Sequence, residues 1–463
     1  MPSRSRCVAA FSSGRSRYTR IVSRVTTVRA PGRGRRRLLL LAVAVAGCAA
    51  TTLVAAQRDS RGVWMGVLDE HPAIAWATRP TTDAVAALNR RLVAGEASLT
   101  FEPGSGYLRS VLAALDVSAA SQMLVLSRTG VQRMVTSPAN PRALFYNEQV
   151  SVGFIRRSPF LELIAHDAEQ GAVFYTLDQR PAERPAFSRQ RGCLTCHVAS
   201  ATLEVPGFMT RSLAAGTDGT LKLRLGSHDL IDHRTPFDRR WGGWFVTGRH
   251  GTSSHLGNTV VDANETRRSL VPAGALNAAS LDGAVELTGY PAATSDVVAL
   301  AVFDHQTRAL NLITRLGWEA RVAAHEGRVP LETPAVTATL GDLVDYLLFV
   351  GEAAMPGGLH GSSGFAEWFS ARGPKDARGR TLHALDLTTR LMRYPLSYTI
   401  DSAAFDALPD EIRAEVYRGL ARVLVAGDPA LKYAHLTPAD RRAVVEILRE
   451  TRPDARSHLA AAP

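Results

Sequence analysis

Five consecutive residues, Cys193-Leu194-Thr195-Cys196-His197, carry the clearest chemical potential in this chain. Two thiols separated by two residues can form thioether bonds to the two vinyl groups on one edge of a porphyrin, and a histidine directly after them can bind the iron. The chain has only 4 Cys and 13 His among 463 residues, so chance seldom produces this order. The pattern therefore predicts covalent attachment of one haem. The alternatives are a redox-active dithiol, half of a zinc site, or a chance arrangement.

The motif resembles the haem site of c-type cytochromes. This resemblance implies that Cys193 and Cys196 form the thioether bonds and that His197 is the proximal iron ligand of a haem c. It covers these five residues only. A small cytochrome c is a helical unit of about one hundred residues, whereas this chain is far longer and is predicted to be β-rich around the motif. The chain is more similar to uncharacterised, large, exported bacterial monohaem proteins, a similarity that implies no activity.

The second axial ligand of the iron would distinguish an electron carrier, with a filled site, from a ligand-binding or catalytic haem with an open one. His305 lies on the apolar face of a predicted helix, where a histidine is usually a hydrogen-bonded core residue. His250 and His255 lie in a glycine-containing loop, and Met209 follows His197 by twelve residues. We expect the distal ligand among His305, His255, His250 and Met209, with histidine favoured over methionine.

Other chemistry has little support in the sequence. Arg189, Arg191 and Arg211 flank the motif, where they could pair with haem propionates by charge-assisted hydrogen bonds; each is otherwise a surface arginine. The chain has no glycine-rich phosphate loop and no second haem motif, and its acidic residues lack the spacing of a metal-binding loop.

The positive charge of the chain is confined to its beginning. The formal net charge is +11, but residues 1–37 contain eleven Arg and no Asp, Glu or Lys. The rest of the chain has 43 basic and 43 acidic residues and is formally neutral. The net charge of the chain is therefore no argument for nucleic-acid binding, and we predict no nucleic-acid partner.

An uncharged apolar segment, residues 38–56, follows the arginines, as in export signals and membrane anchors. Nineteen residues can just span a bilayer if they are retained. Cleavage after Ala56 and lipid attachment to Cys48 are the other two possibilities, and an Arg-rich, acid-free leader also fits a mitochondrial transit peptide. We expect a periplasmic or otherwise extracytoplasmic body, anchored to the membrane. After cleavage only Cys193 and Cys196 would remain, which excludes a disulfide framework.

The body is predicted to be an α+β protein. We expect a leader and anchor at residues 1–56, a helical region at 57–145, a haem-bearing α+β region at 146–330, and a mainly helical region at 331–463. Strands are predicted at 150–155, at 161–165 and 172–177 as a hairpin, and at 241–248. A long helix is predicted to begin at Ser295-Asp296, and residues 382–392 are predicted to be another helical segment.

These features together predict an exported, membrane-tethered monohaem c-type cytochrome. It would transfer single electrons to redox partner proteins that the sequence does not identify, and we favour a carrier over an enzyme. The first alternative is a haem enzyme or gas or redox sensor with an open sixth iron position, because the body is much larger than one carrier haem needs. The second is a Cys-x-x-Cys thiol oxidoreductase without haem.

Overall fold

The computed structural model describes residues 69–222, 229–264, 268–270, 277–283, 285–355 and 357–459. The chain divides into two compact units, residues 1–63 and 64–463, and every described residue belongs to the second. The arginine-rich leader, the apolar segment 38–56 and Cys48 lie outside the described residues. Among the helices that are described, none combines the length and the apolar character needed to span a bilayer.

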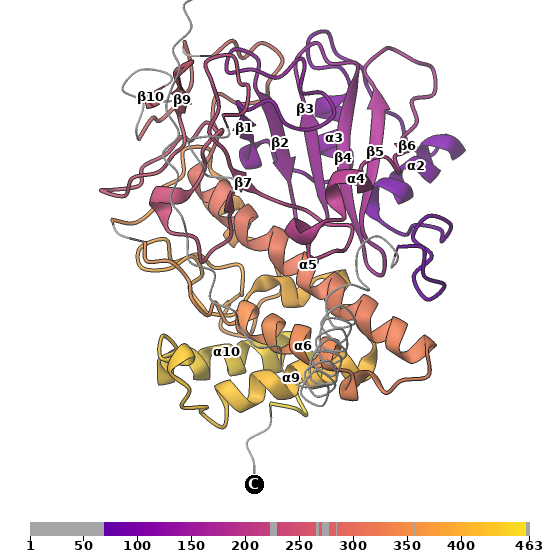
Figure 1. Cartoon of the computed structure of the whole chain (residues 1–463), viewed down its shortest axis with the longest axis vertical. Helices are drawn as coiled ribbons and strands as arrows, with labels where there is room; N and C mark the ends of the chain where they lie inside the picture. Colours follow the sequence, from indigo (N-terminus) through magenta and orange to yellow (C-terminus); the bar gives the residue numbers. More distant parts are fainter. Residues whose placement is uncertain are drawn as a thin grey trace, which may run out of the picture. The chain divides into compact units, whose positions relative to one another are not determined.

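One antiparallel sheet of six strands forms the upper part of the described unit in the view of Figure 1, with its strands in sequence order. The longest pair, β4 and β5, is the predicted hairpin, in which Leu163 lies opposite Tyr175. Buried and half-buried residues alternate along β4, as expected for a strand with two different faces. The strands are β1 (Met123–Val125), β2 (Arg142–Tyr146), β3 (Val150–Phe154), β4 (Phe160–Asp167), β5 (Gly171–Asp178) and β6 (Ser188–Arg189).

Helices cover both faces of this sheet. On one face, α2 (Ala84–Ala94) is joined to β5 by the hydroxyl of Tyr175, which donates to Asp83 Oδ2 over 2.7 Å at the beginning of the helix. On the other face lies α5 (Val297–His325), where the Tyr146 hydroxyl donates to the Ala299 carbonyl over 2.7 Å. A third helix, α3 (Leu108–Ala114), buries its own apolar side in the same core.

The long helix α5 is the main internal support of the fold. Asp296 caps its beginning by accepting hydrogen bonds from the backbone N–H groups of Val298 and Ala299, at 2.8 and 3.0 Å. Nearly all of its side chains are buried, because the sheet lies on one side and the C-terminal helices lie on the other (Figure 1). These helices are α6 (Pro334–Leu347), α7 (Phe365–Ser370), α8 (Ala403–Asp406), α9 (Asp410–Leu424) and α10 (Pro438–Thr451).

The predicted α+β class is confirmed, and so is the mainly helical C-terminal region. The expected boundary at residue 146 falls at the end of β2, which pairs with β3, so the regions on either side share one sheet. Short strand pairs complete the described structure: β7 (Arg211–Ser212) with β8 (Asp229–Leu230), and β9 (Thr259–Val261) with β10 (Arg268–Leu270).

Two of the predicted elements are wrong. Residues 382–392 do not form a helix, because the Asp386 carboxylate accepts hydrogen bonds from the backbone N–H groups of Thr388 and Thr389 and holds a turn. Residues 241–248 do not form a continuous strand, because their backbone pairs with separate segments in turn: Trp244 with Val125, and Thr247 with Asp296.

Candidate haem site

The cysteine-histidine motif forms α4 (Leu194–His197), a single helical turn in which the His197 N–H donates to the Cys193 carbonyl over 3.0 Å. Residues three and four apart lie on the same side of a helix, so this turn places Cys196 and His197 on the side of Cys193. Both thiols are free; Cys193 is half-buried and Cys196 is exposed. Two exposed or half-buried thiols therefore lie on one helical turn with a histidine.

The imidazole of His197 is held in a defined orientation. Its Nδ1 donates to the carbonyl oxygen of Gly207 over 2.8 Å, and burial lowers the pKa of the ring, so the neutral form is favoured. In that form Nε2 carries the lone pair, and it makes no hydrogen bond among the described residues. A histidine that binds a metal through one nitrogen usually donates its other N–H to a carbonyl or carboxylate. The geometry of His197 fits an iron ligand.

The loop that carries Gly207 is itself fixed by α5. The side chain of Asn311 accepts a hydrogen bond from the Phe208 N–H over 3.0 Å and donates one to the Phe208 carbonyl over 2.7 Å. A Cβ atom at position 207 would lie 2.2 Å from Asn311 Oδ1, so the close approach requires glycine. Helix α5 therefore sets the orientation of His197 through this loop.

The sheet provides the surroundings of the motif. The Phe174 ring on β5 lies 4.8 Å from the His197 ring, centroid to centroid. Arg142 and Glu162, on β2 and β4, form an ion pair of 3.6 Å on the same face of the sheet as Phe174. Burial raises the pKa of the Cys193 thiol, and the negative charge of Glu162 raises it further.

His305 is a core residue between α5 and the C-terminal region. Its Nδ1 lies 2.8 Å from Nδ1 of His233, and its Nε2 lies 2.7 Å from the Ser397 hydroxyl. The ring is stacked on Tyr346 and Phe349, with centroid distances of 5.1 and 4.4 Å. Both ring nitrogens are engaged in this arrangement, which leaves neither of them available to iron.

The other three distal candidates differ in whether the atoms that could bind iron already have hydrogen-bond partners. Nδ1 of His250 donates to the Ser253 carbonyl over 2.6 Å, and its Nε2 accepts the Asn277 N–H over 3.3 Å. His255 is buried, neither of its ring nitrogens has a partner in the described part of the chain, and burial lowers its pKa to about 3. Met209 is half-buried, two residues beyond Gly207. Within the described ranges, the side-chain hydrogen bond and the ring contact of His197 go to Gly207 and Phe174 and not to any of the four candidates.

The three arginines expected near the propionates differ in position and in exposure. Arg189 lies under the opposite face of the sheet, with its guanidinium 4.2 Å from the centroid of the Trp76 ring and a hydrogen bond of 3.2 Å to Gln170 Oε1. Arg191 and Arg211 are exposed. Of the three arginines, only these two have side chains at the surface.

The sequence analysis missed two residues of this site. Gly207 and Asn311 hold His197, but one acts through a backbone carbonyl and the other comes from a helix more than a hundred positions away. The Pro206-Gly207 pair soon after the motif was the available signal. Across the described ranges, no three His, Cys, Asp or Glu side chains come together as a metal-binding group. A haem site of this kind takes only one such ligand, His197, from the motif.

Comparison with known proteins adds no assignment. No protein-family model matches this chain, and neither a curated protein nor a solved structure matches it.

Proposed function

We propose that this protein is a monohaem c-type cytochrome. Cys193 and Cys196 hold the haem through thioether bonds, and His197 binds the iron through Nε2. The bound haem supplies a one-electron couple. The body would be exported to an extracytoplasmic compartment and anchored through residues 38–56 or a lipid on Cys48. There it would pass electrons to a redox partner protein.

One observation carries this proposal: the hydrogen bond of 2.8 Å from His197 Nδ1 to the Gly207 carbonyl. It supports the iron-binding tautomer, with Nε2 free, in a chain whose sequence places this histidine directly after Cys-x-x-Cys. The partly exposed thiols also leave one edge of the motif open to a partner.

The engaged nitrogens of His305 and His250 favour the second candidate, a haem enzyme or sensor with an open sixth position. Among the described residues, His255 and Met209 are the two expected distal ligands whose iron-binding atoms make no hydrogen bond. A thiol oxidoreductase has less support, because its attacking cysteine needs a lowered pKa, whereas burial raises the pKa of Cys193.

Expression with a haem c maturation system tests the proposal. The denatured protein should retain haem on a gel, and Cys193→Ala with Cys196→Ala should lose it. His197→Ala should keep covalent haem but change the spectrum of the iron. Loss of all haem from the denatured wild-type protein would refute the assignment.

The same sample separates carrier from enzyme or sensor. A low-spin spectrum that carbon monoxide does not alter indicates a filled sixth position. His255→Ala and Met209→Ala then identify the ligand, since only the true one converts the spectrum to high spin. A spectrum that changes readily with carbon monoxide favours the open site.

A further inference from the structure

The loop that joins β1 to β2 reverses the usual burial of polar and apolar side chains. Its polar residues Gln132 and Thr136 are buried, whereas Val131 is 63% exposed and Met134 is 77% exposed. Val135, at 39%, is exposed as well, so three large apolar side chains face outwards within five positions. Apolar side chains scattered singly over a surface need no explanation, but a group of them marks a contact surface.

Hydrogen bonds hold this loop in one shape. The Gln132 amide donates to the Phe160 carbonyl at the beginning of β4 over 3.1 Å, and the Thr136 hydroxyl donates to the Gln132 carbonyl over 3.3 Å. Arg142, on β2, donates to the Thr129 hydroxyl over 2.9 Å. Because the loop is already ordered, little conformational entropy is lost when a partner covers its outer side chains.

Two arginines beside the apolar side chains have no counter-charge. Arg133 belongs to the loop, and Arg157 lies in the turn that joins β3 to β4. The Asn140 side chain donates to the carbonyl oxygens of Val135 and Arg156 over 2.8 and 3.2 Å, which places that turn next to the loop. Arg133 and Arg157 are both exposed, and neither forms an ion pair within the described chain.

Other charged side chains around the loop are matched within the protein. Their nitrogen–oxygen distances are 3.0 to 3.6 Å, in the pairs Arg128–Asp218, Arg142–Glu162, Arg156–Glu286 and Arg180–Asp178. Asp178 is exposed at the end of β5, opposite Phe160. The two unmatched arginines therefore give the apolar group a positive border. Together they form what we call the loop surface: Val131, Arg133, Met134, Val135 and Arg157.

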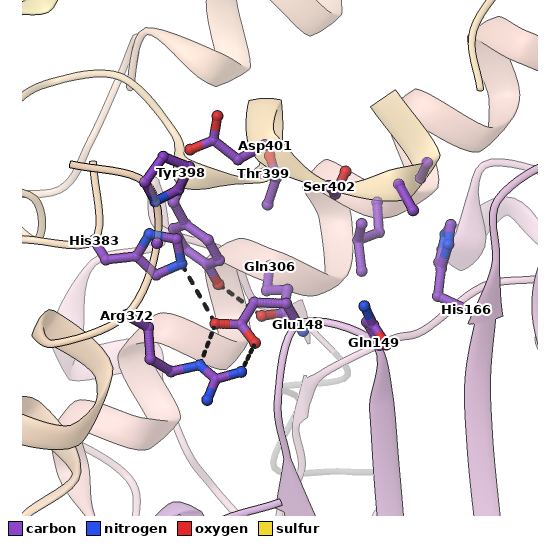
Figure 2. A pocket seen from close by; sticks show the side chains of 15 residues that line it. Glu148, Gln149, His166, Gln306, Arg372, His383, Tyr398, Thr399, Asp401 and Ser402 are labelled. Atoms are coloured by element: carbon purple, nitrogen blue, oxygen red, sulfur yellow. Dashed lines mark hydrogen bonds and ion pairs between the residues drawn. The ribbon is translucent and has the colours of Figure 1, made fainter. Parts of the chain in front are cut away.

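The loop surface lies outside the cavities described for this chain. One cavity, of about 410 Å³, lies between the turn that joins β2 to β3 and the C-terminal region (Figure 2). Another, of about 520 Å³, lies at the end of α9. No side chain of the loop surface lines either of them, so its residues project from the molecule rather than enclose a ligand. Buried residues form the floor of the first cavity: Gln306, Leu310, His383, Tyr398, Thr399 and Ala404.

The size of the loop surface favours a lipid bilayer over a protein as its partner. A stable protein interface takes about 20–30 residues from each side, far more than the loop surface contains. A bilayer requires no complementary shape. Apolar side chains enter the boundary between headgroups and acyl chains, and basic side chains remain beside anionic headgroups. Projecting aliphatic side chains with unmatched arginines at their border fit this partner.

We propose that the loop surface binds the anionic surface of a lipid bilayer. Val131, Met134 and Val135 enter the headgroup region, while Arg133 and Arg157 pair with lipid phosphates. A tether alone would leave the body free to rotate, whereas this contact turns the beginning of β4 towards the bilayer. The contact requires neither haem nor the anchor proposed at residues 38–56, and its failure would leave the proposed function untouched.

Photolabelling of the full-length chain tests this contact. The protein is mixed with vesicles of phosphatidylcholine that carries a diazirine in its acyl chain, with and without phosphatidylglycerol, and the labelled residues are mapped by peptide mass spectrometry. Residues 129–142 should be labelled at least about fivefold more strongly than residues 90–96 around Val93. Val93 is a suitable reference because it is 69% exposed but stands outside the loop surface. Phosphatidylglycerol should increase the labelling of residues 129–142.

Exposed positions allow variants that should fold, and thermal melts verify this. Val131→Glu with Met134→Glu should reduce labelling of the loop by about tenfold or more, because carboxylates replace apolar side chains at an anionic surface. Val93→Glu is the matched control and should leave that labelling unchanged. Arg133→Gln with Arg157→Gln should reduce it by about fivefold or more, and only in vesicles with phosphatidylglycerol. The leader is the same in every variant, so it cannot produce these differences.

Three results would overturn the proposal. The loop could be labelled no more than residues 90–96, which would point to a protein partner instead. The double glutamate variant could be labelled as strongly as the wild type. The double glutamine variant could lose labelling equally with and without phosphatidylglycerol, which would exclude recognition of the anionic headgroup.

Discussion

Asp304 is a fully buried acidic residue in the middle of α5. Trp241 Nε1 donates to its Oδ2 over 2.9 Å, but Oδ1 has no partner in the described part of the chain. Burial raises the pKa of Asp304 to about 7, against the lowering effects of Arg240 and the Trp241 hydrogen bond. The folded protein thus holds a proton here that the unfolded chain, with a carboxyl pKa near 4, does not.

The raised pKa of Asp304 determines the direction in which the free energy of unfolding changes with pH. Folding takes up a proton between pH 4 and pH 7, so the free energy of unfolding falls as the pH rises through that interval and then levels off. Asp304→Asn keeps an acceptor for Trp241 and removes the titration. Between pH 5 and pH 8, the free energy of unfolding measured with urea should fall by up to about 3 kcal/mol more in the wild type than in the variant. Equal losses in both proteins would contradict this, and Asp178→Asn should behave as the wild type.

Cys193 provides a second prediction at this scale. Because burial and then Glu162 raise the pKa of its thiol, the haem-free protein should alkylate slowly at Cys193 near neutral pH. The rate should increase only above the pH at which free cysteine ionises. Iodoacetamide labelling followed by peptide mass spectrometry measures this in a chain without residues 1–56. Fast labelling at pH 7 would instead support the thiol oxidoreductase alternative.

At the scale of elements, α5 holds the loop that orients His197. Asn311→Ala removes two buried hydrogen bonds to the Phe208 backbone, and we expect it to lower the free energy of unfolding by about 1–3 kcal/mol. If the protein carries the proposed haem, Asn311→Ala should also shift its midpoint potential, because the His197–Gly207 hydrogen bond would loosen. Unchanged stability and potential would show that the loop does not need this support.

Elements with a regular apolar period could be predicted from the sequence. Val298, Val302 and Leu316 recur at helical spacing and lie on α5, and the β4–β5 hairpin follows its alternating pattern. The error at residues 382–392 arose because one side chain, Asp386, forms a turn in the middle of a leucine-containing stretch. Local patterns do not include such competition between a side chain and the helix backbone.

In the functional sites, the residues that the sequence could indicate are separated even more clearly from those that it could not. The five residues of the motif are adjacent in the sequence, so a haem attachment site could be proposed from their order alone, whereas Gly207 and Asn311 act through tertiary contacts. The cavity of Figure 2 was not predicted at all. Three of the residues that line it, Glu148, His383 and Asp401, come from segments up to about 250 positions apart, and no spacing rule connects them.

At the scale of the molecule, the charge is divided between the leader and a formally neutral body. The chain without residues 1–56 should therefore show no measurable affinity for duplex DNA, even at low salt, where phosphate contacts are strongest. Fluorescence anisotropy with a labelled duplex measures this. The full-length chain is the comparison, because its eleven arginines should bind DNA in a salt-dependent way. Tight binding by the truncated chain would reveal a basic surface that the formal charge conceals.

The C-terminal region completes the core rather than forming a separate module. The ring of His305 on α5 packs on Tyr346 and Phe349 of the following segment, and the Tyr346 hydroxyl donates to the His305 carbonyl over 3.1 Å. One hydrophobic cluster runs from Ile74 to Leu459 through both faces of α5. Removing residues 331–463 would expose one whole side of that helix.

We therefore expect the body to unfold as one unit. Calorimetry of residues 57–463 should give a single transition, since sheet, α5 and C-terminal helices share their buried surface. Residues 57–330 alone should be aggregated or should lack a cooperative transition, because the apolar side of α5 would face water. Two separate transitions in the longer chain, or a cooperatively folded 57–330 fragment, would mean that the C-terminal helices are an independent domain. Their part in building the floor of the cavity would then be a contact between domains.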